Sequence, residues 1–413
     1  MKHFITSVMA LVLVAGSFVV VQNSWYGKDN SNPSRIQNSK YDNLEKTSPY
    51  SGVVEQSIFI PYWNIPKLSL DLEEYNELIY FGIAPDENGE LIQDTGFTNI
   101  ATFIQNTPSD TNRLLTIRML DTDNNLTLLD SKSKQQRVID EAKLLVLQYD
   151  FDGIVLDLEM GVIPFDDTKD KITSFIKRFS EVAHNGIIPP LRDNPDNTKA
   201  LTFSLTIYGD TFYRARPYDV EKLAYDVDKI YIMAYDFHKS RGEPGPNFPL
   251  TRRSLGEGGL VDNDYGYDFQ TMIADFTQIM PREKITVLFG MYGYDWTLGS
   301  QGKPLKAAKA IPLYEIEQEY KNCQHTVIST EVNEENGVEK SLQKRDSSAL
   351  LGMTKCKVIR DSVSKEKHIT YTDDEGYDHV LWYEDHESVA VKKQYLKEQG
   401  IGSIGYWVWG YFN

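Results

Sequence analysis

Asp157 and Glu159 have the residue types and the spacing that acid–base chemistry requires. They end the segment Tyr149–Glu159, in which Gly153–Leu158 is mostly apolar. Side chains alternate between the two faces of a strand, so these carboxylates point the same way. Two like charges held side by side raise each other's pKa, and one of them can then keep a proton near neutral pH and donate it.

The alternative interpretation of this spacing is a solvated strand end whose acids merely begin a loop. The run Phe151–Leu156 argues against it, because a nearly continuous apolar stretch is typical of a parallel strand buried on both faces. We therefore expect proton chemistry at the end of a core strand.

Repeated β-α units must position this pair. Short apolar runs alternate with helix-like segments that include Lys134–Gln148, Thr168–Ala183 and Val389–Gln399. This alternation predicts an α/β fold, namely a (β/α)8 TIM barrel. The active site of such a barrel lies at the carboxyl ends of its strands. The eight predicted strands are Ser57–Tyr62, Glu77–Ala84, Arg113–Met119, Gly153–Leu158, Leu201–Ile207, Lys229–Ala234, Lys284–Gly290 and Gly402–Val408.

The chain divides into four predicted regions. Residues 1–21 are an apolar export segment, either a signal peptide or a signal anchor, and 22–52 form a polar, flexible tether. Residues 53–413 form the barrel. Within it, 297–379 break the β-α rhythm and predict a small α+β insertion after strand seven, although a long surface loop is the alternative.

Charge and cysteine content limit the partners. The net charge is −17 and no basic stripe is visible, which excludes nucleic acid and attraction to an anionic membrane surface. We expect contact with a membrane only through the N-terminal apolar segment, and a monomer. Cys323 and Cys356 follow the export segment and can pair in an oxidising compartment. The seven histidines are scattered, so we expect no metal and no cofactor.

The segment Asp152-Gly153-x-x-x-Asp157-x-Glu159 resembles the fourth-strand signature of glycoside hydrolase family 18. That family contains chitinases, endo-β-N-acetylglucosaminidases and peptidoglycan hydrolases of spore germination. The closing segments of the chain are most similar to the spore-germination and cell-wall branch. Further segments that resemble the family are Phe59–Trp63, Tyr231–His238, Gly290–Trp296, Val380–Asp385 and Gly405–Gly410.

The resemblance implies substrate-assisted hydrolysis, in which the 2-acetamido group of the sugar attacks its own anomeric carbon. It implies that Glu159 is the general acid and later the base, that Asp157 accepts the acetamido N–H, and that Tyr235 donates to the acetamido oxygen. It also implies substrate contacts for Asp236, Met233, Trp407, Tyr292 and Tyr62, and structural roles for Asp152 and Gly153. Taken alone, Tyr235 could be an ordinary core tyrosine, and Trp409 has the same strand parity as Trp407.

Val155 is the departure from the family pattern, which has an aspartate there. By parity its side chain lies below Asp157 on the same face, where it can neither donate nor accept a hydrogen bond. We expect Asp157 to turn instead toward Glu159 or bound substrate, with reduced activity or an altered acid limb of the pH profile.

The predicted function is an extracytoplasmic, retaining glycoside hydrolase acting on a polymer that contains N-acetylglucosamine, such as peptidoglycan or chitin. The alternative is a catalytically weak or inactive carbohydrate-binding barrel, which Val155 favours and the retained Asp157 and Glu159 oppose. A third possibility, a metal-dependent polysaccharide deacetylase, lacks the His/Asp cluster that such chemistry needs.

Overall fold

The computed structural model describes residues 54–67, 72–161, 167–185, 201–252, 265–326 and 356–412. The export segment and tether predicted over 1–21 and 22–52 lie outside these ranges. Within them, none of the helices combines the length and the apolar character needed to cross a bilayer.

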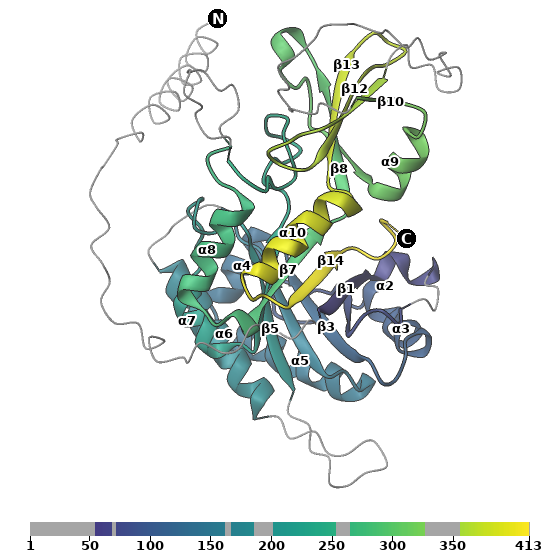
Figure 1. The fold of residues 1–413 in the computed structure, drawn as a ribbon. Coiled ribbons are helices and arrows are strands. Elements are labelled where there is room, and N and C mark those ends of the chain that lie inside the picture. The colour runs from purple at the N-terminus through teal and green to yellow at the C-terminus, as the bar shows by residue number, and fades with distance from the viewer. Residues whose placement is uncertain are drawn as a thin grey trace, which may run out of the picture. The chain divides into compact units, whose positions relative to one another are not determined.

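A closed barrel of parallel strands forms the centre of the described chain (Figure 1). Neighbouring strands pair in parallel all the way round, with one shift of register between β2 and β3, and β1 closes the barrel against β14. The eight predicted strands are confirmed, with ends that differ by two residues or fewer. The barrel strands are β1 (Glu55–Pro61), β2 (Glu77–Ile83), β3 (Asn112–Met119), β4 (Gly153–Leu158), β5 (Thr202–Tyr208), β6 (Lys229–Ala234), β7 (Ile285–Gly290) and β14 (Ser403–Trp407).

Alternation along β4 explains how one strand serves two environments. Every residue of β4 is buried. Ile154, Leu156 and Leu158 belong to the large apolar core that includes the helices, whereas Val155 belongs to a smaller cluster inside the barrel. The parity expected from the sequence therefore holds, and Val155 lies on the inward face that also carries Asp157.

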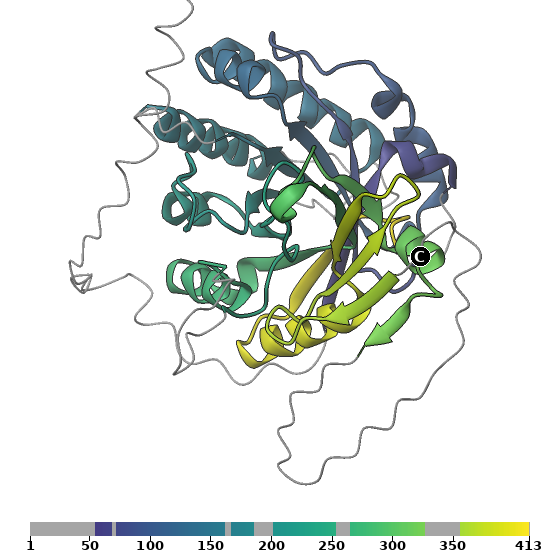
Figure 2. The same ribbon diagram turned by 90° about the horizontal axis from the view of Figure 1, so that it is seen from above.

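Helices cover the outside of the barrel (Figure 1 and Figure 2). Two of the three predicted helices agree closely with α5 and α6. The third, α10, begins three residues before its predicted start, because Asp385 and Ser388 form a capping box. The helices are α2 (Thr95–Thr98), α3 (Ile100–Asn106), α4 (Thr122–Leu129), α5 (Lys132–Tyr149), α6 (Thr168–His184), α7 (Val220–Asp226), α8 (Phe269–Ile279), α9 (Leu313–Glu319) and α10 (His386–Glu398), with short 3-10 turns η1 (Tyr62–Lys67), η2 (Arg282–Lys284) and η3 (Ser300–Gly302).

A second sheet follows β7, as the predicted insertion requires. Its strands lie in the order β10-β11-β12-β13-β8-β9. It extends beyond the expected 297–379 at both ends, because β8 and β13 pair antiparallel from Gly293 and Tyr383 onward. Cys323 and Cys356 form a disulfide here, with Cα atoms 5.2 Å apart. The strands are β8 (Tyr292–Leu298), β9 (Lys309–Pro312), β10 (Gln324–Thr326), β11 (Cys356–Arg360), β12 (Lys367–Thr372) and β13 (Asp378–Tyr383).

A buried charged cluster of Glu366, Glu384 and Lys392 ties this second sheet to the barrel. The Lys392 ammonium on α10 contacts Glu366 at 2.9 Å and also contacts Glu384, and all three side chains are fully buried. Glu366 accepts hydrogen bonds from the backbone N–H groups of Asn247 and Phe248, in the loop after β6. The cluster therefore joins the insertion, a barrel helix and a barrel loop.

Candidate active site

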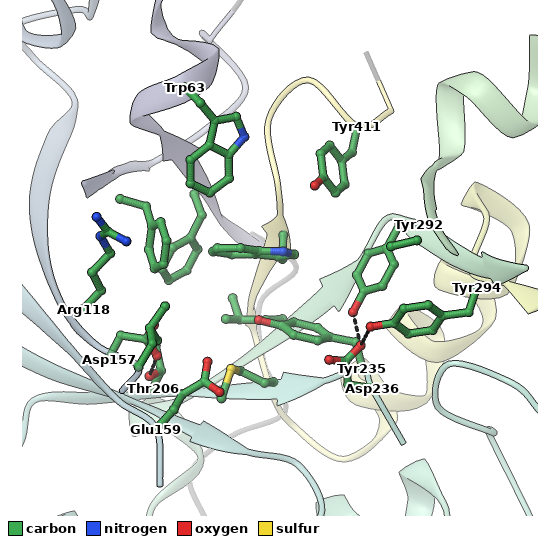
Figure 3. Close-up of a pocket in the computed structure, with 17 residues that line it drawn as sticks. Trp63, Arg118, Asp157, Glu159, Thr206, Tyr235, Asp236, Tyr292, Tyr294 and Tyr411 are labelled. Carbon is green, nitrogen blue, oxygen red and sulfur yellow. Dashed lines mark hydrogen bonds between the residues drawn. The ribbon is translucent and has the colours of Figure 1, made fainter. Parts of the chain in front are cut away.

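A cavity of about 330 Å³ opens where the carboxyl ends of the barrel strands meet the second sheet (Figure 3). Aromatic rings form much of its wall, and three carboxylates and one guanidinium reach it. The lining residues are Phe59, Trp63, Phe81, Arg118, Leu120, Asp157, Glu159, Thr206, Met233, Tyr235, Asp236, Leu288, Tyr292, Tyr294, Ala310, Trp407 and Tyr411.

The structure brings most of the residues predicted from the sequence into this one cavity. They come from the ends of three barrel strands, β4, β6 and β14, and from β8, and they are Asp157, Glu159, Met233, Tyr235, Asp236, Tyr292 and Trp407.

Tyr62 does not line the cavity, contrary to expectation, and Trp63 does. Strand β1 ends at Pro61 and a 3-10 turn begins at Tyr62, so strand alternation no longer decides which side chain faces inward. Tyr62 instead lies behind the wall. Its ring packs edge-on against Trp63 at 5.1 Å and lies under the Arg118 guanidinium at 5.3 Å.

Asp152 and Gly153 have structural contacts. The Asp152 carboxylate accepts the backbone N–H of Arg113 at 2.8 Å, which joins the starts of β3 and β4. A Cβ at Gly153 would lie 2.0 Å from Thr202 Oγ1, so the close approach of β4 and β5 requires glycine there. Both residues therefore set the position of the strand that carries the acidic pair.

Asp157 is 4% exposed and accepts a hydrogen bond from the Thr206 hydroxyl on β5. Burial raises the pKa of Asp157 to about 8, and the neighbouring Glu159 charge adds to this rise. The Thr206 hydrogen bond and the Arg118 charge oppose it. The sequence predicts that Asp157, without a polar residue at 155, turns toward Glu159 or bound substrate. The Thr206 hydroxyl occupies Oδ1 of Asp157, and the turn itself stays a prediction.

Glu159 follows the last residue of β4 and accepts a hydrogen bond from the Tyr208 hydroxyl at 2.5 Å. Burial raises the pKa of Glu159. The Tyr208 hydrogen bond and the charges of Lys239 and Arg216 oppose the rise, whereas the Asp236 charge adds to it. A buried carboxyl group that retains its proton toward neutral pH is suited to donate that proton to a leaving group.

Asp236 is held in a fixed orientation at the end of β6. Its backbone is left-handed, with φ 59°, and its N–H donates to Asn247 Oδ1 at 2.7 Å. The hydroxyls of Tyr292 and Tyr294 both donate to its Oδ1, the latter at 2.9 Å (Figure 3). Asp236 therefore offers its remaining oxygen to a ligand.

Trp407 is distinguished from Trp409 by its environment. Trp407 lines the cavity and packs against Phe81 at 4.8 Å and against Tyr235 at 6.5 Å in a stacked arrangement. Trp409 belongs to the outer core, and its backbone N–H bonds Phe59 O. Strand β14 ends at Trp407, so the shared parity of the two tryptophans no longer applies beyond that point.

Sequence reasoning missed several cavity residues, and it missed Tyr208, which donates to Glu159 but is not among the residues that line the cavity. Thr206 and Tyr208 alternate on β5 beside Asp157 and Glu159 on β4, so neighbour-strand parity could have found them. Arg118 lies on the predicted third strand and could have been found in the same way. Tyr294 lies on the second sheet, inside the segment Gly290–Trp296 that resembles the family, although only Tyr292 of that segment was predicted to contact substrate. Tyr411 comes from the chain end, where no local pattern marks it. In the described part of the chain, no cluster of three or more His, Cys, Asp or Glu side chains is arranged to hold a metal ion.

Residues 50–411 match the family described as glycosyl hydrolases family 18. The chain belongs to glycosyl hydrolase family 18. The cortical fragment-lytic enzyme of Bacillus anthracis is 28% identical over 233 residues, covering 52% of this chain and 51% of that protein. The endochitinase of Brugia malayi is 22% identical over 288 residues, covering 67% and 48%. This family 18 chain spans about half the length, or less, of the curated relatives it matches first.

Solved structures show the same fold. The Bacillus cereus spore cortex-lytic enzyme SleL aligns with a TM-score of 0.59 at 21% identity, covering 87% of this chain and 71% of that one. Human YKL-39, described as a pseudo-chitinase with retained chitooligosaccharide binding properties, aligns with a TM-score of 0.64 at 18% identity, covering 86% and 92%. The expected family and barrel are thus confirmed.

Proposed function

We propose that this family 18 protein is a retaining glycoside hydrolase that cleaves polysaccharide containing β-linked N-acetylglucosamine, of the peptidoglycan or chitin type. The observation that carries the proposal is the single cavity shared by Glu159, Asp157 and Tyr235. Its volume is at the lower end of the range for ligand pockets, which suits one sugar ring held deeply and its neighbours held at the rim.

Glu159 is the proton donor of the proposed reaction. Its carboxyl proton passes to the glycosidic oxygen while the bond from that oxygen to the anomeric carbon breaks. The carbonyl oxygen of the 2-acetamido group attacks the anomeric carbon from the opposite side, which gives a cyclic oxazolinium intermediate. A water molecule then adds at the anomeric carbon and gives a proton to Glu159. Two inversions at one carbon retain its configuration.

Asp157 and Tyr235 orient the acetamido group in this scheme. Asp157 accepts its N–H and offsets the positive charge that develops on the ring. The Tyr235 hydroxyl donates to the acetamido oxygen, which places that oxygen for attack. Trp407 packs beneath the acetyl methyl group, and Asp236 accepts sugar hydroxyls. The raised pKa of Tyr235, caused first by burial and then by the charge of Asp157, keeps the phenol protonated as a donor.

The substrate class and location follow from separate observations. The relative named as a cortical fragment-lytic enzyme supports peptidoglycan, and the endochitinase supports chitin. The apolar residues 1–21 support action outside the cytoplasm, with the protein secreted or anchored by that segment.

A second candidate function is binding of N-acetylglucosamine oligomers without turnover. Val155 favours it, because it places an apolar side chain beneath Asp157. The likeness to a pseudo-chitinase that retains oligosaccharide binding is consistent with it. The retained acidic pair and Tyr235 favour the hydrolase.

Digestion of purified peptidoglycan and of chitin, followed by product analysis, tests the proposal. We expect new reducing ends on N-acetylglucosamine, released initially as the β-anomer. Binding of chitin oligomers with no new reducing end from either polymer would support the binding protein instead. Products with free amino groups would indicate a deacetylase, and sensitivity to a chelator would strengthen that result.

A further inference from the structure

Strand β5 supplies one hydroxyl to each member of the acidic pair. Thr206 donates to Asp157 Oδ1, and Tyr208 donates to Glu159 Oε2 at 2.5 Å. The two donors are two residues apart on β5. The two acceptors are also two residues apart, with Asp157 on β4 and Glu159 directly after its last residue. The parallel register that pairs Leu156 with Leu205 brings the two rows side by side. The same inward face of β5 therefore serves both carboxyl groups.

Each hydroxyl occupies one oxygen of its carboxyl group. A hydrogen bond donated to Glu159 Oε2 favours the proton on Oε1, since a protonated oxygen is the weaker acceptor. A hydrogen bond donated to Asp157 Oδ1 leaves Oδ2 for the acetamido N–H. Val155 lies directly below on β4, fully buried, and offers neither a donor nor an acceptor. Strand β5 thus supplies one donor to each acid, whereas the side chain at position 155 of β4 supplies none.

The Tyr208 ring is itself held in place by charged neighbours. The Arg216 guanidinium lies 3.9 Å from the ring centroid and the Lys239 ammonium 5.1 Å from it. Arg216 is fixed in turn by Asp210, which accepts from its Nη2 at 2.9 Å and from its Nε at 3.2 Å. A tyrosine held in this way has little freedom to turn its hydroxyl away from Glu159.

We propose that Thr206 and Tyr208 are positioning residues that hold Asp157 and Glu159 on separate donors, so that each carboxyl group presents a defined oxygen to the sugar. This inference rests on the hydrolase function proposed above. By this inference, the two hydroxyl groups on β5 prevent Asp157 and Glu159 from sharing a proton with each other.

Other charged and titratable groups face Asp157 and Glu159 from the neighbouring elements. They also affect the pKa values of the two acids, so each hydroxyl variant is compared with the parent, in which these groups are the same. They are Arg118 on β3, Arg216 and Tyr218 in the loop after β5, and Tyr235, Asp236 and Lys239 at the end of β6.

The pH dependence of kcat/KM on a chromogenic N-acetylglucosamine oligomer tests the role of Tyr208. A hydrogen bond donated to a carboxylate stabilises its charged form, so its loss raises the pKa of Glu159. We expect Tyr208→Phe to move the alkaline limb upward by about one pH unit. The matched control is Tyr267→Phe, which removes a tyrosine hydroxyl bonded to Asp275 at 2.8 Å outside the cavity and leaves the profile unchanged. A Tyr208→Phe profile that superimposes on that of the parent overturns the proposal.

Thr206 is tested by an isosteric and a conservative variant. Thr206→Val removes the donor to Asp157 at constant shape, and we expect roughly tenfold lower kcat with little change in KM, since the acetamido group is bound but misaligned. Thr206→Ser keeps the hydroxyl and restores most of the loss. Equal losses in both variants would mean that packing, and not the hydrogen bond, is responsible, and would overturn this part of the proposal.

A measurement without substrate separates this inference from the proposed function. Carbon-13 carboxyl NMR titrations, assigned with Asp157→Asn and Glu159→Gln, report the two acids directly. If the parent protein turns over no oligomer, the hydrolase proposal fails, but the titrations still decide the role of β5. We expect Tyr208→Phe to shift Glu159 more than Asp157, and Thr206→Val to shift Asp157 more than Glu159. Unchanged titration of both acids in both variants contradicts the inference.

Discussion

Two regions of this molecule bury a pair of carboxyl groups, and they hold them in opposite ways. In the cavity, Asp157 and Glu159 receive hydroxyl donors from β5 and face the opening. In the charged cluster of Glu366, Glu384 and Lys392, an ammonium group contacts both acids, and all three side chains are 0% exposed.

The comparison shows that a perturbed pKa does not identify a catalytic acid by itself. Burial raises the pKa of Asp157 to about 8, and it raises that of Glu384 to about 8 although Lys392 opposes the rise. What differs is access, since the cavity acids can reach a substrate and the cluster acids are enclosed by packing. In a closed cluster, a raised pKa is a consequence of packing. In an open cavity, an acid with a raised pKa can transfer its proton to a substrate.

The largest expected effect lies in the cavity. Glu159→Gln keeps the size of the side chain but removes the proton donor, so we expect turnover of a chromogenic N-acetylglucosamine oligomer to fall by about 10²- to 10⁴-fold. The melting temperature should be unchanged or higher. Glu319→Gln, at the exposed end of α9, is the matched control. Full activity in Glu159→Gln would remove this residue from the chemistry.

Substitution in the charged cluster should lower stability and should not act on the chemistry. Lys392→Met leaves two acids buried without their cation, and breaking a buried charge pair costs about 3–5 kcal/mol of unfolding free energy. Denaturant unfolding measures this loss. The control is Lys397→Met on the exposed side of the same helix, which should be nearly neutral. If Lys392→Met lost activity at full stability, the contrast between the two regions would be wrong.

The disulfide of the second sheet should contribute somewhat less stability than Lys392. Cys323 and Cys356 are 33 residues apart, and closing a loop of that length restricts the unfolded chain by about 3–4 kcal/mol in the chain-entropy description. Unfolding of the double variant Cys323→Ala/Cys356→Ala, compared with the parent under oxidising and reducing conditions, checks this. An equal midpoint for parent and variant under oxidising conditions would contradict it.

The smallest expected effect is on the pH profile. The proton donor Glu159 must carry its proton, so rising pH removes activity. Because burial raises the pKa of Glu159, we expect the alkaline limb of kcat/KM to lie above the pH at which an exposed glutamate loses its proton, and a pH–rate profile on the same oligomer measures it.

Val155→Asp sharpens this point, because it adds a third carboxyl group below Asp157. We expect an acid limb altered by about one pH unit. The isosteric Val155→Thr adds a hydroxyl without a charge and serves as its control. A Val155→Asp profile identical to that of the parent would contradict the role given to this position.

Sequence by itself determined the barrel, its eight strands and the acidic pair. These follow from local regularities, namely apolar runs of strand length, alternation between faces, and a carboxylate pair at a strand end. The same alternation placed Val155 correctly beneath Asp157. It failed at Tyr62, where the strand had already become a 3-10 turn, and it could not separate Trp407 from Trp409 beyond the end of β14.

Only the tertiary structure decided the partners of each acid. Thr206 and Tyr208 are 49 residues from the carboxyl groups they serve, and Tyr294 reaches Asp236 across 58 residues. It also decided that Lys392 contacts Glu366 and Glu384 in a closed cluster, while Asp157 and Glu159 face an open cavity. Hydrogen bonding and burial depend on which distant segments the closed barrel brings together. A local pattern of residue types does not show which segments those are.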